Sequence, residues 1–272
     1  MFRKFTSERV RRVRRRRLAI FSVIYGLLTL SVFLVLWQLS LAPFWRIDVL
    51  EISGTRAIPH QDIFDFVTER LYGGYGGVFS KRNALIAPRA SIQNGLVREF
   101  PRIRKVDVDA KDFHTLEIEI TEHEPEALVC NTGSSTCYFV NEEGYVFDEA
   151  PRFLGDSYVT YSAHLVDDPL GKWFLAHTGG FAQLHAFVES LERLSLFPRT
   201  VVVAESSFTV SARVRFQDIQ LLFSRSLPYD ESFLNLEAIL REEDFSVESV
   251  ASIDLRFGNK VFFKPRAEVG GE

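Results

Sequence analysis

Motifs that would mark an enzyme or a metal site are scarce in this 272-residue sequence. It has two cysteines, but no CxxC pair and no Cys/His spacing typical of a zinc site. Its six histidines form no HExxH motif, and no two of them stand four residues apart. GxSxG, SxxK and the glycine-rich phosphate loops (GxGxxG, GxxxxGKS/T) are also missing. We therefore expect no catalytic residues, no metal site and no cofactor. The sequence predicts that the chain is not an enzyme, with a membrane-anchored envelope enzyme as a less favoured alternative.

One histidine and one acidic pair have a composition that could suggest a site. His123 stands between Glu122 and Glu124, and Asp167-Asp168 precedes Pro169. A catalytic site needs groups that converge from separate elements, whereas these residues are sequence neighbours. We interpret the first as a charged cluster at a strand end and the second as a turn.

The most informative feature that is present is an uncharged stretch from Leu18 to Trp45. About 20 apolar residues cross a bilayer, and Leu18 to Ala42 supplies 25. A cleaved signal peptide is the alternative, but its apolar region would be only about 7–15 residues long. The sequence predicts a retained transmembrane helix over 18–42.

Residues 1–17 form a strongly basic tail, with nine Lys or Arg against Glu8 alone, for a net charge of +8. Since the whole chain is −4, residues 18–272 carry −12. Basic flanks stay cytoplasmic, so the N-terminus is expected in the cytoplasm and the bulk of the chain outside it. Nucleic-acid binding is the alternative, but no stacking or groove-reading element accompanies the arginines. We predict no nucleic-acid partner.

The two cysteines, Cys130 and Cys137, enclose Asn-Thr-Gly-Ser-Ser-Thr. Thiols outside the cytoplasm tend to pair, and this centre suits a hairpin turn. A local disulfide is therefore predicted, with two free thiols as the alternative.

Hydrophobic periodicity predicts an α+β chain with two domains after the membrane helix, followed by a tail over 265–272. Residues 43–123 have the order β-α-α-β-β, with both helices expected on one sheet face. Residues 124–264 read as a mostly antiparallel β domain with flanking helices, although 152–179 cannot be assigned.

Four helices are expected, over 59–71, 89–100, 180–196 and 230–241. The clearest strand runs from Phe208 to Phe216, with every second residue apolar, and a turn at Asp218 is expected to follow it. Gly258-Asn259 predicts a two-residue hairpin turn before a last strand, 260–264.

Several of these segments together resemble the FtsQ/DivIB family of bacterial cell-division proteins. The resemblance rests on five segments in order: Ile47–Gly54, Phe100–Val108, Thr115–Ala127, Phe139–Phe147 and Ser252–Val261. The first three are similar to the opening strand and closing hairpin of a POTRA domain. The last contains Asp254-Leu255-Arg256-Phe257, similar to the C-terminal Asp-Leu-Arg-aromatic signature of the family. Asn141 departs from the aspartate that is common in the family.

The resemblance implies a non-enzymatic single-pass protein of the cytoplasmic (inner) membrane, located at the division septum. Implied partners are FtsB-like and FtsL-like division proteins and the machinery of septal peptidoglycan synthesis. A POTRA-containing component of envelope secretion or assembly is the alternative function.

Two surfaces are predicted to bind partners. The first is the C-terminal hairpin, because the last strand of a chain is a natural sheet edge and extended peptides add to such edges. Its candidate residues are Arg256, Phe257, Asn259, Val261, Phe262 and Phe263. The second surface is the strand that carries Lys105 and Val108. For both surfaces the alternative is an ordinary core strand, with Arg256 paired inside the chain.

Overall fold

The computed structural model describes residues 8–40, 42–76, 79–133, 136–151, 157–175, 180–258 and 260–266. The chain divides into two compact units. Unit 1 comprises Met1–Leu96 and Lys105–Thr121, and unit 2 comprises Val97–Arg104 and Glu122–Glu272.

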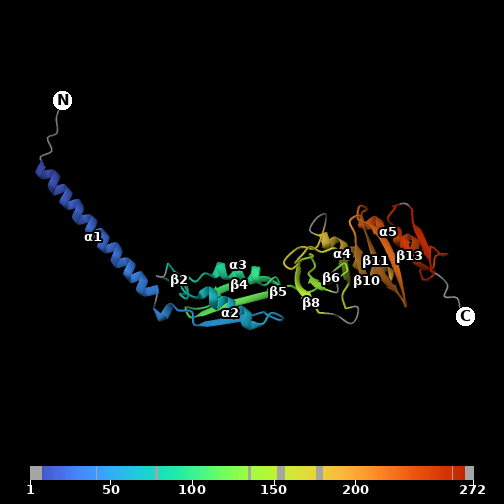
Figure 1. Cartoon of the computed structure of the whole chain (residues 1–272), viewed down its shortest axis with the longest axis horizontal. Helices are drawn as coiled ribbons and strands as arrows, with labels where there is room; N and C mark the ends of the chain where they lie inside the picture. Colours follow the sequence, from blue (N-terminus) through green and yellow to red (C-terminus); the bar gives the residue numbers. More distant parts are fainter. Residues whose placement is uncertain are drawn as a thin grey trace, which may run out of the picture. The chain divides into compact units, whose positions relative to one another are not determined.

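Helix α1 (Glu8–Ser40) leads the chain (Figure 1). Its stretch Arg14–Gln38 is long and apolar enough to cross a membrane, and none of that stretch is buried inside the protein. Apolar side chains that remain exposed are what a bilayer requires of a spanning helix. The expectation of one long apolar helix near the N-terminus is confirmed.

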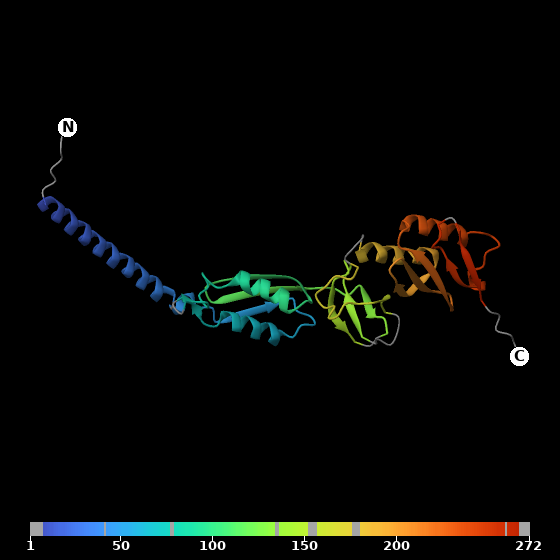
Figure 2. The same ribbon diagram turned by 45° about the horizontal axis from the view of Figure 1, so that its top comes forward.

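The rest of unit 1 is built on a three-stranded sheet with strand order β1-β5-β4. Its elements are η1 (Pro43–Trp45), β1 (Val49–Ser53), α2 (His60–Leu71), β2 (Gly74–Tyr75), β3 (Phe79–Ser80), α3 (Arg89–Glu99), β4 (Ile103–Ala110) and β5 (Thr115–Glu122). Strands β1 and β5 run parallel, and β2 pairs with β3 in a small separate ribbon. Helices α2 and α3 lie alongside the three strands (Figures 1 and 2).

The alternation of apolar and polar residues explains why one face of this sheet is exposed to solvent. In β5 the side chains of Leu116, Ile118 and Ile120 are buried, while Glu117 and Glu119 between them are exposed. Successive side chains of a strand point to opposite faces, so the helices cover one face and water covers the other. The predicted β-α-α-β-β order is confirmed, with β2 and β3 added between the helices.

Unit 2 contains a nine-stranded mixed sheet with strand order β14-β13-β12-β11-β10-β9-β6-β7-β8. Its strands are β6 (Ala127–Asn131), β7 (Cys137–Val140), β8 (Val146–Ala150), β9 (Thr160–Ala163), β10 (Phe197–Val203), β11 (Ser207–Val214), β12 (Gln217–Ser224), β13 (Val250–Asp254) and β14 (Phe262–Pro265). The helical segments are α4 (Gly180–Ser190), η2 (Leu191–Leu194), α5 (Tyr229–Leu240) and η3 (Val247–Ser249). Helices α4 and α5 pack over the sheet (Figure 2), and their apolar side chains share one core cluster with the strands.

Strand β9 joins the two halves of this sheet. It pairs in parallel with β10 on one side and with β6 on the other, and its Tyr161 is fully buried. It lies inside the segment that the sequence left unassigned. A third parallel pair joins β12 and β13, so the sheet is mixed, although most of its pairs are antiparallel as predicted.

Three details of the sequence reading are wrong. Strand β11 ends at Val214, and Phe216, predicted to be buried, is 99% exposed in the turn that leads to β12. That turn lies at Arg215-Phe216, where Arg215 has φ 52°, whereas Asp218 is already inside β12. The predicted two-residue connection at Gly258-Asn259 is too short, because β13 ends at Asp254 and β14 begins only at Phe262. Apolar alternation marks a face, but it does not show where a strand stops pairing.

The predicted disulfide is present. Cys130 and Cys137 lie opposite each other on β6 and β7 and are joined, so the bond links two neighbouring antiparallel strands. Strands β7 and β8 form an antiparallel hairpin about Glu142-Glu143-Gly144.

Candidate functional site

The C-terminal edge of the nine-stranded sheet is formed by β14, which pairs with β13 on one side only. Within the described ranges no further strand covers its other side. Phe262 is 55% exposed and Phe263 46%, and all four residues of the strand are exposed. Edge strands of sheets usually carry charged residues or proline, which prevent pairing with other chains. Here Lys264 and Pro265 do so only at the far end of the strand. The alternative of a core strand therefore does not hold for β14, and the predicted 260–264 strand is shifted to 262–265.

The other predicted residues of this hairpin lie in different environments. Phe257 is exposed, with its ring centroid 5.4 Å from that of Phe262. Val261 is half-buried against the core cluster of unit 2. Asn259 lies outside the described residues. The exposed aromatic surface of this edge consists of Phe257, Phe262 and Phe263, which we call the C-terminal aromatic edge.

Arg256 is paired within the chain, as the alternative reading expected. Its Nε and Nη2 donate to the two carboxylate oxygens of Asp254 at 2.9 and 2.6 Å. The hydrogen bonds from Arg256 hold the pKa of the Asp254 carboxyl below its usual range. An acidic partner would have to displace Asp254 before it could use this guanidinium, so Arg256 contributes less to the edge than the phenylalanines do.

The second predicted surface, around Lys105 and Val108, lies on the outer strand β4 of the three-stranded sheet. Val108 is 6% exposed and Val106 1%, so both fill the core as the alternative reading expected. Lys105 is exposed, and a hydrogen bond to Asp107 raises its pKa. An aspartate at Val108 would be buried, and its effect would therefore report on folding rather than on docking.

His123 lies in a small aromatic cluster of unit 2. Its ring centroid is 5.0 Å from that of Tyr145 and 5.4 Å from that of Phe147, and Asn141 Nδ2 donates to its Nδ1 at 3.1 Å. Burial, with a smaller contribution from the charge of Arg104, lowers the pKa of His123 to about 4. A neutral imidazole that packs against rings is a structural group, and it differs from the charged strand-end cluster that the sequence suggested.

This lowered pKa predicts a pH-dependent loss of stability. The unfolded chain protonates His123 near pH 6.5 and the folded chain only near pH 4, so the stabilisation is complete above pH 6.5 and is lost as the pH falls through 4. The shift corresponds to roughly 1–2 kcal/mol once solvent screening of the half-buried ring is allowed for. His123→Phe should flatten the dependence of the melting temperature on pH between 6.5 and 4. The control His164→Gln, at an exposed histidine, should keep the wild-type slope. Equal slopes in wild type and His123→Phe would contradict the assignment.

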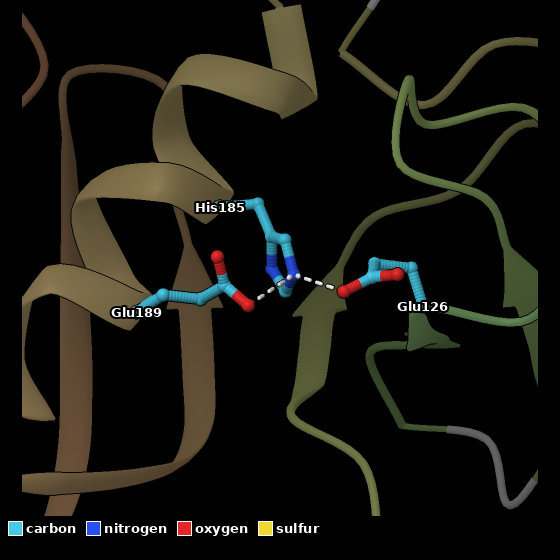
Figure 3. A group of neighbouring side chains, drawn as sticks. All are labelled: Glu126, His185 and Glu189. Carbon is cyan, nitrogen blue, oxygen red and sulfur yellow. Dashed lines mark hydrogen bonds and ion pairs between the residues drawn. The ribbon is translucent and has the colours of Figure 1, made fainter.

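A third constellation was not found from the sequence. Glu126, directly before β6, meets His185 and Glu189 of α4, and one ligand atom of each lies within 4.8 Å of the others (Figure 3). His185 Nε2 is 3.4 Å from Glu126 Oε1 and 3.5 Å from Glu189 Oε1. No pair of histidines marks this cluster in the sequence. The signal that could have found it is the His-x-x-x-Glu spacing of His185 and Glu189 on the helix predicted over 180–196.

Tyr161 on β9 contacts the other ring nitrogen of His185, Nδ1. Its hydroxyl is 2.8 Å from His185 Nδ1, and both residues are buried. Burial, with smaller contributions from Glu189, Tyr229 and Glu126, raises the pKa of Tyr161 above its usual value, so the hydroxyl stays protonated. The imidazole is therefore held on one side while Nε2 faces the two carboxylates.

The sequence matches no model of a known protein family and no curated protein.

Proposed function

We propose that this chain is a non-enzymatic, membrane-anchored binding protein of the bacterial division machinery, of the FtsQ/DivIB type. The observation that carries the proposal is the C-terminal aromatic edge. An outer strand offers unpaired N–H and C=O groups, and exposed aromatic side chains beside it supply the contacts that fix a partner strand by β-addition. The partners would be FtsB-like and FtsL-like proteins, and the complex would support septal peptidoglycan synthesis.

The N-terminal region supports the location. Within α1 the apolar residues directly follow Arg14, Arg15, Arg16 and Arg17, which favours a single span with the N-terminus in the cytoplasm. The β-α-α-β-β order of unit 1, with its three-stranded sheet, supports the expectation of a POTRA-like module after the span. The C-terminal aromatic edge adds a binding role to these two features.

The test is complementation in cells depleted of the native protein. We expect the tagged wild type to gather at the septum and to restore division. Phe262→Ala combined with Phe263→Lys should remain in the membrane but fail to restore division, because the edge loses its apolar anchors. Loss of such anchors typically weakens capture by about 2 kcal/mol or more, or roughly 30-fold in Kd.

Phe216→Ala is the matched control. Phe216 is 99% exposed in the turn between β11 and β12, two strands that do not pair with β14, so its removal should leave division and capture unchanged. Capture is measured by pull-down of an FtsB-like protein with the full-length chain, alongside the melting temperature of each variant. Normal division of depleted cells, with the tag spread evenly over the envelope, would instead favour a secretion or assembly component.

A further inference from the structure

We propose that Glu126, His185 and Glu189 form a binding site for a divalent transition-metal ion of the zinc type. The three ligands come from two elements of unit 2 that are distant in sequence, since Glu126 precedes β6 and the other two lie one turn apart on α4. Figure 3 shows both carboxylates directed at the imidazole. Residues four apart share one helix face, so α4 presents both of its ligands to the same point.

The spacing of the ligand atoms fits such an ion. Zinc–nitrogen and zinc–oxygen bonds of about 2.0–2.1 Å in a tetrahedral site place neighbouring ligand atoms roughly 3.3–3.4 Å apart. The two distances from His185 Nε2, 3.4 and 3.5 Å, already have this length. The third, between the two carboxylates, is at most 4.8 Å. The side chains of Glu126 and Glu189 are 44% and 56% exposed, so each can rotate to close it.

The imidazole is prepared to act as a ligand. Metal-bound histidines usually donate their second ring N–H to a neighbouring oxygen, which fixes the tautomer and the ring orientation. Here Tyr161 places its hydroxyl oxygen 2.8 Å from His185 Nδ1. When Nδ1 donates to that oxygen, the lone pair of Nε2 points toward the carboxylates.

Charge also favours a cation at this point. Across the part of the chain that the structure describes, neither Glu126 nor Glu189 has a lysine or arginine partner, and both depend on His185 for their ion pairing. A neutral imidazole leaves two carboxylate charges close together, and a divalent ion would neutralise them. One imidazole nitrogen and two carboxylate oxygens suit Zn²⁺, whereas Mg²⁺ strongly prefers an all-oxygen octahedron with several waters. The ion would tie α4 to β6, a structural rather than a catalytic role.

The experiment is a Zn²⁺ titration of the full-length protein in detergent micelles, in competition with a chromophoric chelator. The affinity tag must contain no histidine. We expect about one Zn²⁺ per chain and a rise in melting temperature when Zn²⁺ is added. Glu126→Gln and Glu189→Gln should each weaken binding at least about 10-fold and remove the rise. Mg²⁺ should produce neither effect.

Glu192→Gln is the matched control, because it removes an exposed carboxylate from η2, one turn beyond Glu189 and outside the cluster. It should bind Zn²⁺ like the wild type. Both glutamate variants keep His185 and its contact with Tyr161, so they are expected to fold, which circular dichroism verifies. Wild-type protein without Zn²⁺ binding would overturn the proposal, and so would equal binding by Glu126→Gln, Glu189→Gln and the control. The cluster would then be a histidine that shares one hydrogen between two carboxylates.

Discussion

Replacing Arg102 with methionine is expected to lower the free energy of unfolding of unit 2 by about 3–5 kcal/mol. Arg102 Nε donates to Glu122 Oε2 at 2.9 Å, Nη1 donates to Asp148, and the guanidinium lies 5.4 Å from the Phe147 ring centroid. The Glu122 side chain is only 6% exposed and that of Arg102 19%. Methionine keeps much of the packing volume but removes the positive charge from beside a buried carboxylate. The cost of that buried charge is much larger than the net value of a surface ion pair.

The matched control is Arg104→Met, two residues further along the chain and inside β4. Arg104 pairs with Glu142 at 3.4 Å, but these side chains are 55% and 66% exposed, so the expected cost is below about 1 kcal/mol. Urea unfolding followed by circular dichroism measures both variants, and hydrogen exchange of peptides from β6 to β8 assigns the loss to unit 2. Arg102→Met/Glu122→Leu should recover part of the loss, because both buried charges are then gone. Similar costs for Arg102→Met and Arg104→Met would contradict the prediction.

Gly54→Ala is expected to destabilise unit 1 by about 2–5 kcal/mol, through backbone strain and overpacking together. Gly54 follows β1 and has φ 83°, a conformation that favours glycine. A Cβ at this position would lie 2.0 Å from the carbonyl oxygen of Ile120 in β5. Both obstacles are backbone features, so no side-chain rotation relieves them. The β1–β5 pairing must shift to make room.

Gly73→Ala is the matched control, because it imposes the backbone strain without the steric clash. Gly73 has a nearly identical φ of 81°, but nothing lies within 4 Å of its hypothetical Cβ, so only the conformational cost of about 1–2 kcal/mol applies. Thermal unfolding compares the two variants, and hydrogen exchange of peptides from β1 and β5 locates the effect. If Gly54→Ala costs no more than Gly73→Ala, the close approach to Ile120 does not exist in solution.

The sequence by itself determined the features that depend on neighbouring residues. The uncharged run from Leu18 predicted one long apolar helix, and helical spacing located α2, α3, α4 and α5 within a few residues. Cys130 and Cys137 stand close enough in sequence for a hairpin to pair them, and they are joined. The exposed face of β5 followed from alternation alone.

Only the tertiary structure decided which distant segments meet. Strand β9 sits between β6 and β10 through parallel pairings, which local alternation does not encode. Arg102 contacts Asp148, which is 46 residues away in the sequence, and Glu126 contacts His185, which is 59 residues away. Periodicity shows which face of an element is apolar, but not which other element covers it. The position of β9 and the His–Glu cluster both depend on the strand order of the whole sheet, which brings together segments that are distant in sequence.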